Sequence, residues 1–460
     1  MSKVGRGPEP RGFQGFGHVL VLDDEGDALN KAIDTVWVAF AGCLVLLMQG
    51  GFAMLEVGLT RMKNAGAVAA KVLVNLAFSF AAFWAIGYAF AFGDGNGFIG
   101  ASGWFLEIGN ADGVQSLAYS VVDEPMKFFF QATFAAVALA IVWGTTLDRI
   151  RFGAYLPFAL LFVGVIYPIV AHWVWGGGWL STHFQDFAGS GVVHVTGAAG
   201  AFAAAMLLGP RIGKFRDGKP QPLPGHSMPL ALLGIFILWV GWMGFNAGSF
   251  LGAVDKPIGQ VIVVTNLAGA FGVLGATLVA RLKLGTLDIG MMGNGAIAGL
   301  GAIAGPCAYV APWGGAVIGF VAGSLMVLVV LAVDRIRIDD PIGAIAGHGL
   351  GGITGILGAG LLTTPSAAES LGIGEKGLFY GGGFGQLGWQ VVGLLCIGAF
   401  AFTASYAVFW AIRQTTGLRA PEEAELAGLD ISEHGMFGYP ERFMEVHGAE
   451  PEEPVHISRL

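Results

Sequence analysis

The chain has 460 residues, of which 55% are hydrophobic and 12% charged, and its mean hydropathy is +0.68. Soluble domains carry about 25% charged residues, so 24 basic and 32 acidic side chains cannot cover the surface of a soluble protein of this length. The composition therefore excludes soluble, disordered and nucleic-acid-binding proteins and favours a protein that spans the lipid bilayer.

Apolar runs of about 20 residues are typical of transmembrane helices, and we find eleven of them along the chain. They lie near residues 33–55, 68–92, 126–147, 155–175, 190–209, 228–249, 258–281, 288–304, 311–333, 342–362 and 388–412. Acidic residues interrupt the first 30 positions, which predicts no cleavable signal peptide. We predict an all-α polytopic membrane protein with an N-terminal segment at 1–32, a membrane domain at 33–412 and a tail at 413–460.

Basic residues gather in alternate connections between these runs: 14 lie in one set and three in the other. The larger set comprises Arg61, Lys63, Arg149, Arg151, Arg211, Lys214, Arg216, Lys219, Arg281, Lys283, Arg335, Arg337, Arg413 and Arg419. Because basic loops stay in the cytoplasm, eleven spans place the N-terminus outside and the C-terminus inside.

Small residues give a second compositional signal. Glycine makes up 76 of the 460 residues, more than twice the usual share of about 7%, which indicates closely packed membrane helices. Cys43, Cys307 and Cys396 lie apart in apolar stretches. We therefore expect inert cysteines, no disulfide, no metal site and no cofactor.

The pattern D-x-x-G-x-x-x-x-H-x-x-G occurs twice, first from Asp186 and again from Asp340, with an offset of 154 residues. Each copy opens the fifth span of a five-span half. Since five is odd, the two halves must be inverted relative to each other, a plan common in transporters. We predict a 5+5 inverted repeat followed by one final helix.

The repeat also predicts a site. His194 and His348 each lie eight residues beyond the aspartate of their copy, about 12 Å along a helix. In a hydrocarbon core of about 30 Å, both imidazoles approach the midplane, one from each side. Ionisable residues at that depth are functional by default; the alternative is two packed histidines bonded to backbone.

Aromatic residues cluster near the outer side of this level. Phe130 and Phe134 share one face of the third span, Trp175 ends the fourth, and the sixth carries Phe245 and Ser249. Aromatic faces with a hydroxyl group suit a small monovalent cation. The alternative is that the tryptophan anchors the membrane interface and the phenylalanines are packing.

These motifs together resemble the ammonium transporter (Amt/MEP/Rh) superfamily, and its Amt branch more than its Rh branch, from about Asp34 to Tyr439. The motifs that carry the resemblance are Phe52-Ala-Met-Leu-Glu56 followed by Arg61-Met-Lys-Asn64, Trp175-Gly-Gly-Gly, Asp186-Phe-Ala-Gly to His194, Gly241-Trp-Met-Gly-Phe-Asn-Ala-Gly-Ser249, Asp339-Asp-Pro to His348-Gly-Leu-Gly-Gly, and the tail from Gly417-Leu-Arg-Ala-Pro-Glu-Glu to Gly428-Leu-Asp-Ile-Ser-Glu-His-Gly435. The resemblance implies a homotrimer with one pore through each subunit.

The resemblance also assigns roles by position. Trp175, Ser249 and Phe134 match the outer residues that recruit ammonium. Phe134 and Phe245 match the stacked pair that gates the pore, and Phe130 aligns with a neighbouring span-3 phenylalanine.

Further in, His194 and His348 match the twin histidines of the pore, and Asp186 matches the acid required for activity. Two positions depart from the family pattern: Met243 stands where an aromatic residue is common, and Gly343 stands where some members have aspartate. Neither position belongs to the matched pore set.

The implied function is transport across the cell membrane (the inner membrane of a bacterium), without catalytic residues or enzyme activity. Ammonium, or methylammonium as an analogue, loses a proton near the gate, and neutral ammonia crosses the apolar path. The proton is transferred separately by the imidazoles, or the imidazoles only shape the lumen. The tail is implied to pack on a neighbouring subunit, and a PII signalling protein is the implied cytoplasmic partner.

Three alternatives stay open. One is an ammonium sensor that signals through its tail, and another is an Rh-like channel for neutral gas. The third is an intramembrane metalloenzyme that uses His172, His183 and His194, which are spaced evenly by 11 residues.

Overall fold

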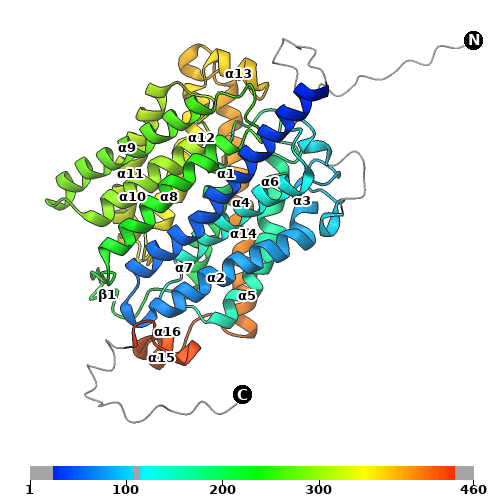
Figure 1. The fold of residues 1–460 in the computed structure, drawn as a ribbon. Helices are drawn as coiled ribbons and strands as arrows, with labels where there is room; N and C mark the ends of the chain where they lie inside the picture. Colours follow the sequence, from blue (N-terminus) through cyan, green and yellow to red (C-terminus); the bar gives the residue numbers. More distant parts are fainter. Residues whose placement is uncertain (1–23, 108–113, 441–460) are drawn as a thin grey trace, which may run out of the picture.

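The computed structural model describes residues 24–107 and 114–440, which form a bundle of long helices (Figure 1). The uninterrupted helices are α1 (Asp24–Leu59), α4 (Glu124–Gly144), α8 (Met228–Gly248), α9 (Ile258–Leu284), α10 (Ile289–Ala304), α11 (Pro312–Arg335) and α14 (Gly385–Thr415). Shorter elements connect them: η1 (Met62–Asn64), η3 (Trp104–Leu106), η4 (Gln115–Leu117), α13 (Pro365–Leu371), η8 (Leu378–Tyr380) and the antiparallel pair β1 (Phe215–Arg216) and β2 (Lys219–Pro220).

Four further spans contain a π-helical stretch. They are α2 (Ala65–Ala82) with η2 (Phe83–Gly87) and α3 (Tyr88–Phe92); α5 (Phe152–Leu161) with η5 (Phe162–Ile166) and α6 (Tyr167–Val174); η6 (Ser190–Val195) with α7 (Thr196–Leu208); and η7 (Ile345–Leu350) with α12 (Gly351–Leu362). Hydropathy does not predict these stretches, because a π turn changes the hydrogen-bonding register and leaves the apolar composition unchanged.

Ten helical stretches in the described part of the chain are long and apolar enough to cross a bilayer. They correspond to ten of the eleven expected spans. The remaining one, expected at 288–304, is the 16-residue helix α10, which is apolar but shorter. The first helix begins at Asp24, before the expected 33, so the predicted N-terminal segment overlaps it. Residues 1–23 of that segment lie outside the described residues.

The outer faces of these helices are apolar. Leu73, Phe236, Leu282 and Leu395 are 64–72% exposed, and they lie on four different helices. A water-soluble protein does not expose large apolar side chains along whole helices, whereas lipid chains solvate them. The protein is therefore a multi-pass membrane protein.

Close contact between backbones explains part of the glycine content. A Cβ atom on Gly319 of α11 would lie 2.1 Å from the carbonyl oxygen of Ala268 on α9. At Gly323, one turn later, it would lie 2.0 Å from the carbonyl oxygen of Gly272. Only glycine permits this separation, in agreement with the small-residue packing expected for membrane helices.

Candidate functional site

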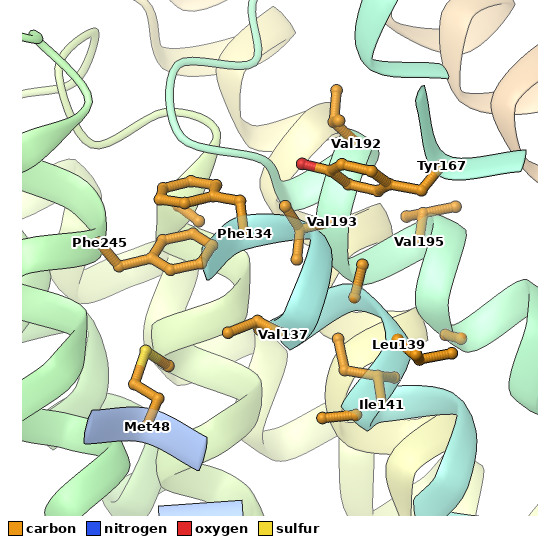
Figure 2. Packing of buried hydrophobic residues seen from close by; sticks show 14 of the residues in the cluster. Met48, Phe134, Val137, Leu139, Ile141, Tyr167, Val192, Val193, Val195 and Phe245 are labelled. Atoms are coloured by element: carbon orange, nitrogen blue, oxygen red, sulfur yellow. The ribbon is translucent and has the colours of Figure 1, made fainter. Parts of the chain in front are cut away.

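A stack of phenylalanine rings lies within the bundle, between α4 and α8. The rings of Phe134 and Phe245 are parallel, with centroids 4.0 Å apart and an interplanar angle of 15° (Figure 2). Phe130 lies one turn from Phe134 on α4, and those two centroids are 4.7 Å apart. All three side chains are buried. The structure thus brings together the three phenylalanines that the sequence suggested as a gate.

Trp175 and Ser249 adjoin this stack. The Trp175 ring meets Phe134 edge-on at 6.1 Å, and its Nε1 donates a hydrogen bond to the backbone carbonyl of Asp186 at 2.8 Å. The Ser249 hydroxyl donates to the carbonyl of Phe245 at 2.8 Å. With its hydrogen committed to the backbone, the Ser249 oxygen keeps its lone pairs to accept a hydrogen bond. An aromatic face and a hydroxyl acceptor therefore lie beside the phenylalanine stack.

The two histidines of the repeat meet below the stack. Nδ1 of His194 lies 3.2 Å from Nδ1 of His348, and the rings are stacked at 17°. Both side chains are buried, and the His194 ring lies 5.7 Å from that of Phe245. Nε2 of His194 has no hydrogen-bond partner among the described residues. The sequence therefore predicted correctly that these two imidazoles meet inside the membrane domain.

Equivalent local structure surrounds the two histidines. Each lies in a π-helical stretch, η6 or η7, and each stretch follows a glycine with positive φ, Gly189 at 108° and Gly343 at 74°. Left-handed backbone of this kind favours glycine. Gly343, which departs from the family pattern, thus occupies a position where its conformational freedom is used.

Two carboxylates hold the starts of these stretches. Asp186 accepts hydrogen bonds from the backbone N–H groups of Gly189, Gly191 and Val192 at 2.8–3.0 Å. Asp340 accepts only two, from Ala344 and Ile345. Burial raises the pKa of each carboxyl to about 6, although the N–H donors oppose that increase.

Two aromatic neighbours of the pair belong to the motifs that carry the resemblance, but no site role was predicted for them. The Phe52 ring on α1 lies 6.1 Å from His348, and the Trp242 ring on α8 lies 5.7 Å from His194. Both side chains are fully buried. Trp242 precedes Phe245 by three residues, so helical spacing was the available signal that they share a face.

The histidines of the metalloenzyme alternative have separate surroundings. Both ring nitrogens of His172 lie within 3.0 Å of backbone carbonyl oxygens, those of Ala91 and Asn96. His183 stacks on Trp389 with centroids 4.4 Å apart. Over residues 24–107 and 114–440, no group of three His, Cys, Asp or Glu side chains has the arrangement of a metal site. Even spacing in the sequence did not bring these histidines together.

A buried ion network joins the basic connections at one end of the bundle. Arg211 donates to both carboxylate oxygens of Asp339, at 2.8 and 3.0 Å, and to Asp148 at 3.3 Å. Arg61 also donates to Asp148, at 2.8 Å, and Arg149 lies 3.9 Å from Asp339. Burial alone raises the pKa of a carboxyl, but these cations outweigh it. The pKa of Asp339 falls to about 2, and that of Asp148 lies below its usual value.

The tail docks on the same end of the bundle through α15 (Glu422–Ala427) and α16 (Leu429–His434), opposite α13 (Figure 1). The Asp430 carboxylate accepts hydrogen bonds from Gly66 and Ala67 at the start of α2. Lys63 donates to the backbone carbonyl of Glu425 at 2.8 Å. Glycines with positive φ flank α16 on both sides (Gly428 and Gly435). The described tail thus contacts its own subunit, and residues 441–460 lie outside the described part.

Comparison with known proteins identifies the family. The model of the Ammonium Transporter Family matches residues 36–439. The chain belongs to this family. Ammonium transporter Amt2 of Archaeoglobus fulgidus is 42% identical over 425 residues, which cover 89% of this chain and 88% of that protein. Ammonium transporter 3 of Dictyostelium discoideum is 36% identical and covers 90% of this chain and 95% of its own length. The expected resemblance is confirmed, and the family comprises transporters, not enzymes.

Solved structures agree with this assignment. A sensor Amt protein superimposes with a TM-score of 0.81 at 33% identity, covering 89% of this chain and all of its own. The crystal structure of Candida albicans Mep2 gives a TM-score of 0.79 at 28% identity, covering 88% of this chain and 90% of its own. This ammonium transporter family member therefore shares the fold of both proteins.

Proposed function

We propose that the protein takes ammonium from outside the cell, removes a proton near the phenylalanine gate and conducts ammonia past the histidine pair. Recruitment is assigned to Trp175, Ser249 and Phe134. Their rings attract a cation through the quadrupole, and the serine oxygen accepts one N–H bond. The observation that carries the proposal is the buried histidine pair, 3.2 Å apart, directly beneath the stacked Phe134–Phe245 rings.

Energetics favour passage of the neutral molecule. Moving an isolated ion into an apolar medium costs on the order of tens of kcal/mol, whereas ammonia carries no charge. Val137 and Ile141 are fully buried apolar residues on α4, the helix that carries Phe134 (Figure 2). Potassium resembles ammonium in charge but cannot lose a proton, so the same path rejects it.

The histidine pair is proposed to orient the ammonia. A bond between two neutral imidazoles requires one Nδ1 to donate and the other to accept. If Nδ1 of His194 donates, its unpartnered Nε2 carries a lone pair that accepts an N–H bond from ammonia. Asp186 is proposed to act as a structural and electrostatic aid, since it fixes the start of the stretch that carries His194.

The cellular arrangement is part of the same proposal. The basic connections face the cytoplasm, the N-terminus lies outside, and spans 1–5 and 6–10 form inverted repeats before the final span. The matching geometry of η6 and η7 supports the repeat. We propose a homotrimer with one pore for each subunit, and a PII signalling protein as a partner at the cytoplasmic face.

A sensor is the second candidate, because one of the structural neighbours is named a sensor Amt protein. The tail contacts η1 and α2 directly, and this contact offers a route from the transport domain to a partner. Normal ammonium signalling in a strain whose protein lacks residues 416–460 would exclude this role. A neutral gas channel is distinguished by the absence of current on addition of ammonium.

Removing both imidazoles tests the proposed function. We expect the double variant H194A/H348A to lose methylammonium uptake into liposomes by about 100-fold, the scale of a positioned acid–base group. Radiolabelled uptake, with potassium as competitor, is the measurement. His183→Ala is the matched control, because that exposed histidine stacks on Trp389 away from the pair. Uptake and selectivity over potassium that survive in the double variant contradict the histidine role.

A further inference from the structure

A line of polar side chains is buried between α1 and α2, beside the histidine pair. Gln49 and Glu56 lie seven residues apart on α1, and Lys71, Asn75 and Ser79 follow one another every four residues on α2. These spacings place each set on one helix face. All five side chains are at most 5% exposed. We call these five residues the polar seam.

Hydrogen bonds of Asn75 join the helices at the middle of the polar seam. Nδ2 of Asn75 donates to Oε1 of Gln49 at 3.0 Å and to the carbonyl of Ala136 on α4 at 3.2 Å. The Trp143 indole, also on α4, donates to Oδ1 of Asn75 at 3.1 Å. The amide of Asn75 therefore ties three helices together and has its hydrogen-bonding groups satisfied.

The seam also contains three buried polar atoms without such partners. Nε2 of Gln49, Oε1 of Glu56 and Oγ of Ser79 have no hydrogen-bond partner among the described residues. A buried polar group without a partner costs free energy comparable to a lost hydrogen bond. Internal water commonly meets such groups in proteins. Polar atoms on both sides of one helix interface therefore suit a short chain of water molecules.

Two ionisable groups occupy the cytoplasmic part of the seam. Glu56 lies three residues before the end of α1, and Lys71 is the charged side chain that acts on it electrostatically. Nζ of Lys71 lies 3.4 Å from the carbonyl oxygen of Ile150, in the connection after α4. The Tyr155 hydroxyl on α5 donates to the carbonyl of Lys71, and Asp148 in the same connection is a further charge acting on Lys71.

The seam passes next to the proposed route of ammonia. Phe52 lies between Gln49 and Glu56 on α1, and its ring contacts that of His348 with centroids 6.1 Å apart. Glu56 follows Phe52 by one helical turn toward the cytoplasm, about 6 Å along the axis. The stretch of α1 that carries Gln49 and Glu56 therefore also carries the ring that adjoins the histidine pair.

We propose that the polar seam holds water and that Glu56 is the residue that exchanges protons with it, so that the proton released from ammonium reaches the cytoplasm apart from ammonia. The inference rests on the proposed function. Ammonium outside breaks one N–H bond, giving ammonia and a proton; the proton forms an O–H bond on the Glu56 carboxylate. That bond breaks when the proton passes to cytoplasmic water, where ammonia takes up a proton again. The net result is one ammonium ion and one charge moved.

Glu56→Gln tests this assignment, because glutamine keeps the shape of the side chain and cannot exchange a proton. In proteoliposomes we expect the current per methylammonium taken up to fall at least tenfold, while initial uptake stays within threefold of wild type. Solid-supported membrane current and radiolabelled uptake are measured on the same preparation. Glu124→Gln is the matched control at the outer end of α4, where that carboxylate pairs with Lys127; its current and uptake should equal those of wild type.

Each result has a defined meaning. Equal current in wild type and E56Q, or a parallel loss of current and uptake, overturns the role of Glu56. If E56Q elutes as aggregate, Gln49→Leu decides, because it replaces the polar centre of the seam with an apolar group. An unchanged ratio of current to uptake in Q49L likewise overturns the proposal. Wild-type uptake without current removes the separate proton path but leaves the transport proposal standing, whereas no wild-type uptake refutes transport itself.

Discussion

Asp186→Asn is expected to lower methylammonium uptake by about 30-fold, and Asp340→Asn by a similar factor. One oxygen of Asp186 accepts from Gly189, and the other accepts from both Gly191 and Val192. An asparagine amide nitrogen cannot accept, so its best orientation keeps the bonds from Gly191 and Val192 and leaves the buried N–H of Gly189 without a partner. That loss costs about 1–3 kcal/mol, and 2 kcal/mol corresponds to about 30-fold in the population of the active arrangement.

Asp340 is the matched comparison because it holds the equivalent stretch in the second copy of the motif. Its two oxygens accept one N–H bond each, from Ala344 and Ile345. Asparagine keeps one bond and loses one, as it does at position 186, so the expected effect is of similar size in free energy. Initial uptake rates of both variants in liposomes, with elution in size-exclusion chromatography as the folding check, measure the two losses. A loss in D186N far larger than that in D340N would show that the number of lost bonds does not govern the effect.

Hydropathy was sufficient to predict most of the fold. Apolar runs of about 20 residues predicted the ten long spans, because lipid requires each crossing segment to satisfy its own backbone. Helix ends were less well predicted. Helix α1 begins at Asp24 and includes Glu25 and Asp27, because charged residues at a helix end can face water. Helix α10, at 16 residues, is apolar as expected but shorter than the ten candidate spans.

The histidine pair was predictable for a different reason. The D-x-x-G-x-x-x-x-H pattern places His194 and His348 at equivalent positions of two similar segments, and the predicted inverted repeat would bring such positions near one axis. The π-helical stretches that carry them were not predictable, because they depend on hydrogen-bond register within a helix. Phe52 and the polar seam were also missed as a group, since their members come from helices whose mutual rotation is set by packing.

The buried ion network was the least predictable feature. Asp148, Arg211 and Asp339 are separated by more than 60 residues in each step, and charge counts in loops carry no information about pairing. In sequence these residues only indicated orientation. The structure shows that they are buried and paired, which makes them the point where connections from both halves of the chain meet.

Arg211→Met should destabilise the protein by about 3–5 kcal/mol, the usual cost of removing one partner from a buried ion pair. Its guanidinium donates three hydrogen bonds to Asp339 and Asp148, whose side chains are both fully buried. Methionine fills similar space but leaves Asp148 with Arg61 as its ion-pair partner, and Asp339 with Arg149 at 3.9 Å. A melting temperature lower by at least about 5 °C in detergent is expected.

The pH dependence of this loss distinguishes ion pairing from packing. A carboxyl whose pKa is lowered by folding stabilises the folded state above its ordinary pKa of about 3.9, and this stabilisation is lost as the pH falls toward the folded value. For Asp339 that value is about 2. The difference in melting temperature between wild type and R211M should therefore have its full size above about pH 4 and shrink between pH 4 and 2. Arg216→Met, at an exposed position of the same connection, should change neither melting nor its pH dependence. A difference in melting temperature that stays constant down to pH 2 would mean that Arg211 stabilises the protein through packing. Arg61 and Arg149 would then be the cations that pair with Asp148 and Asp339.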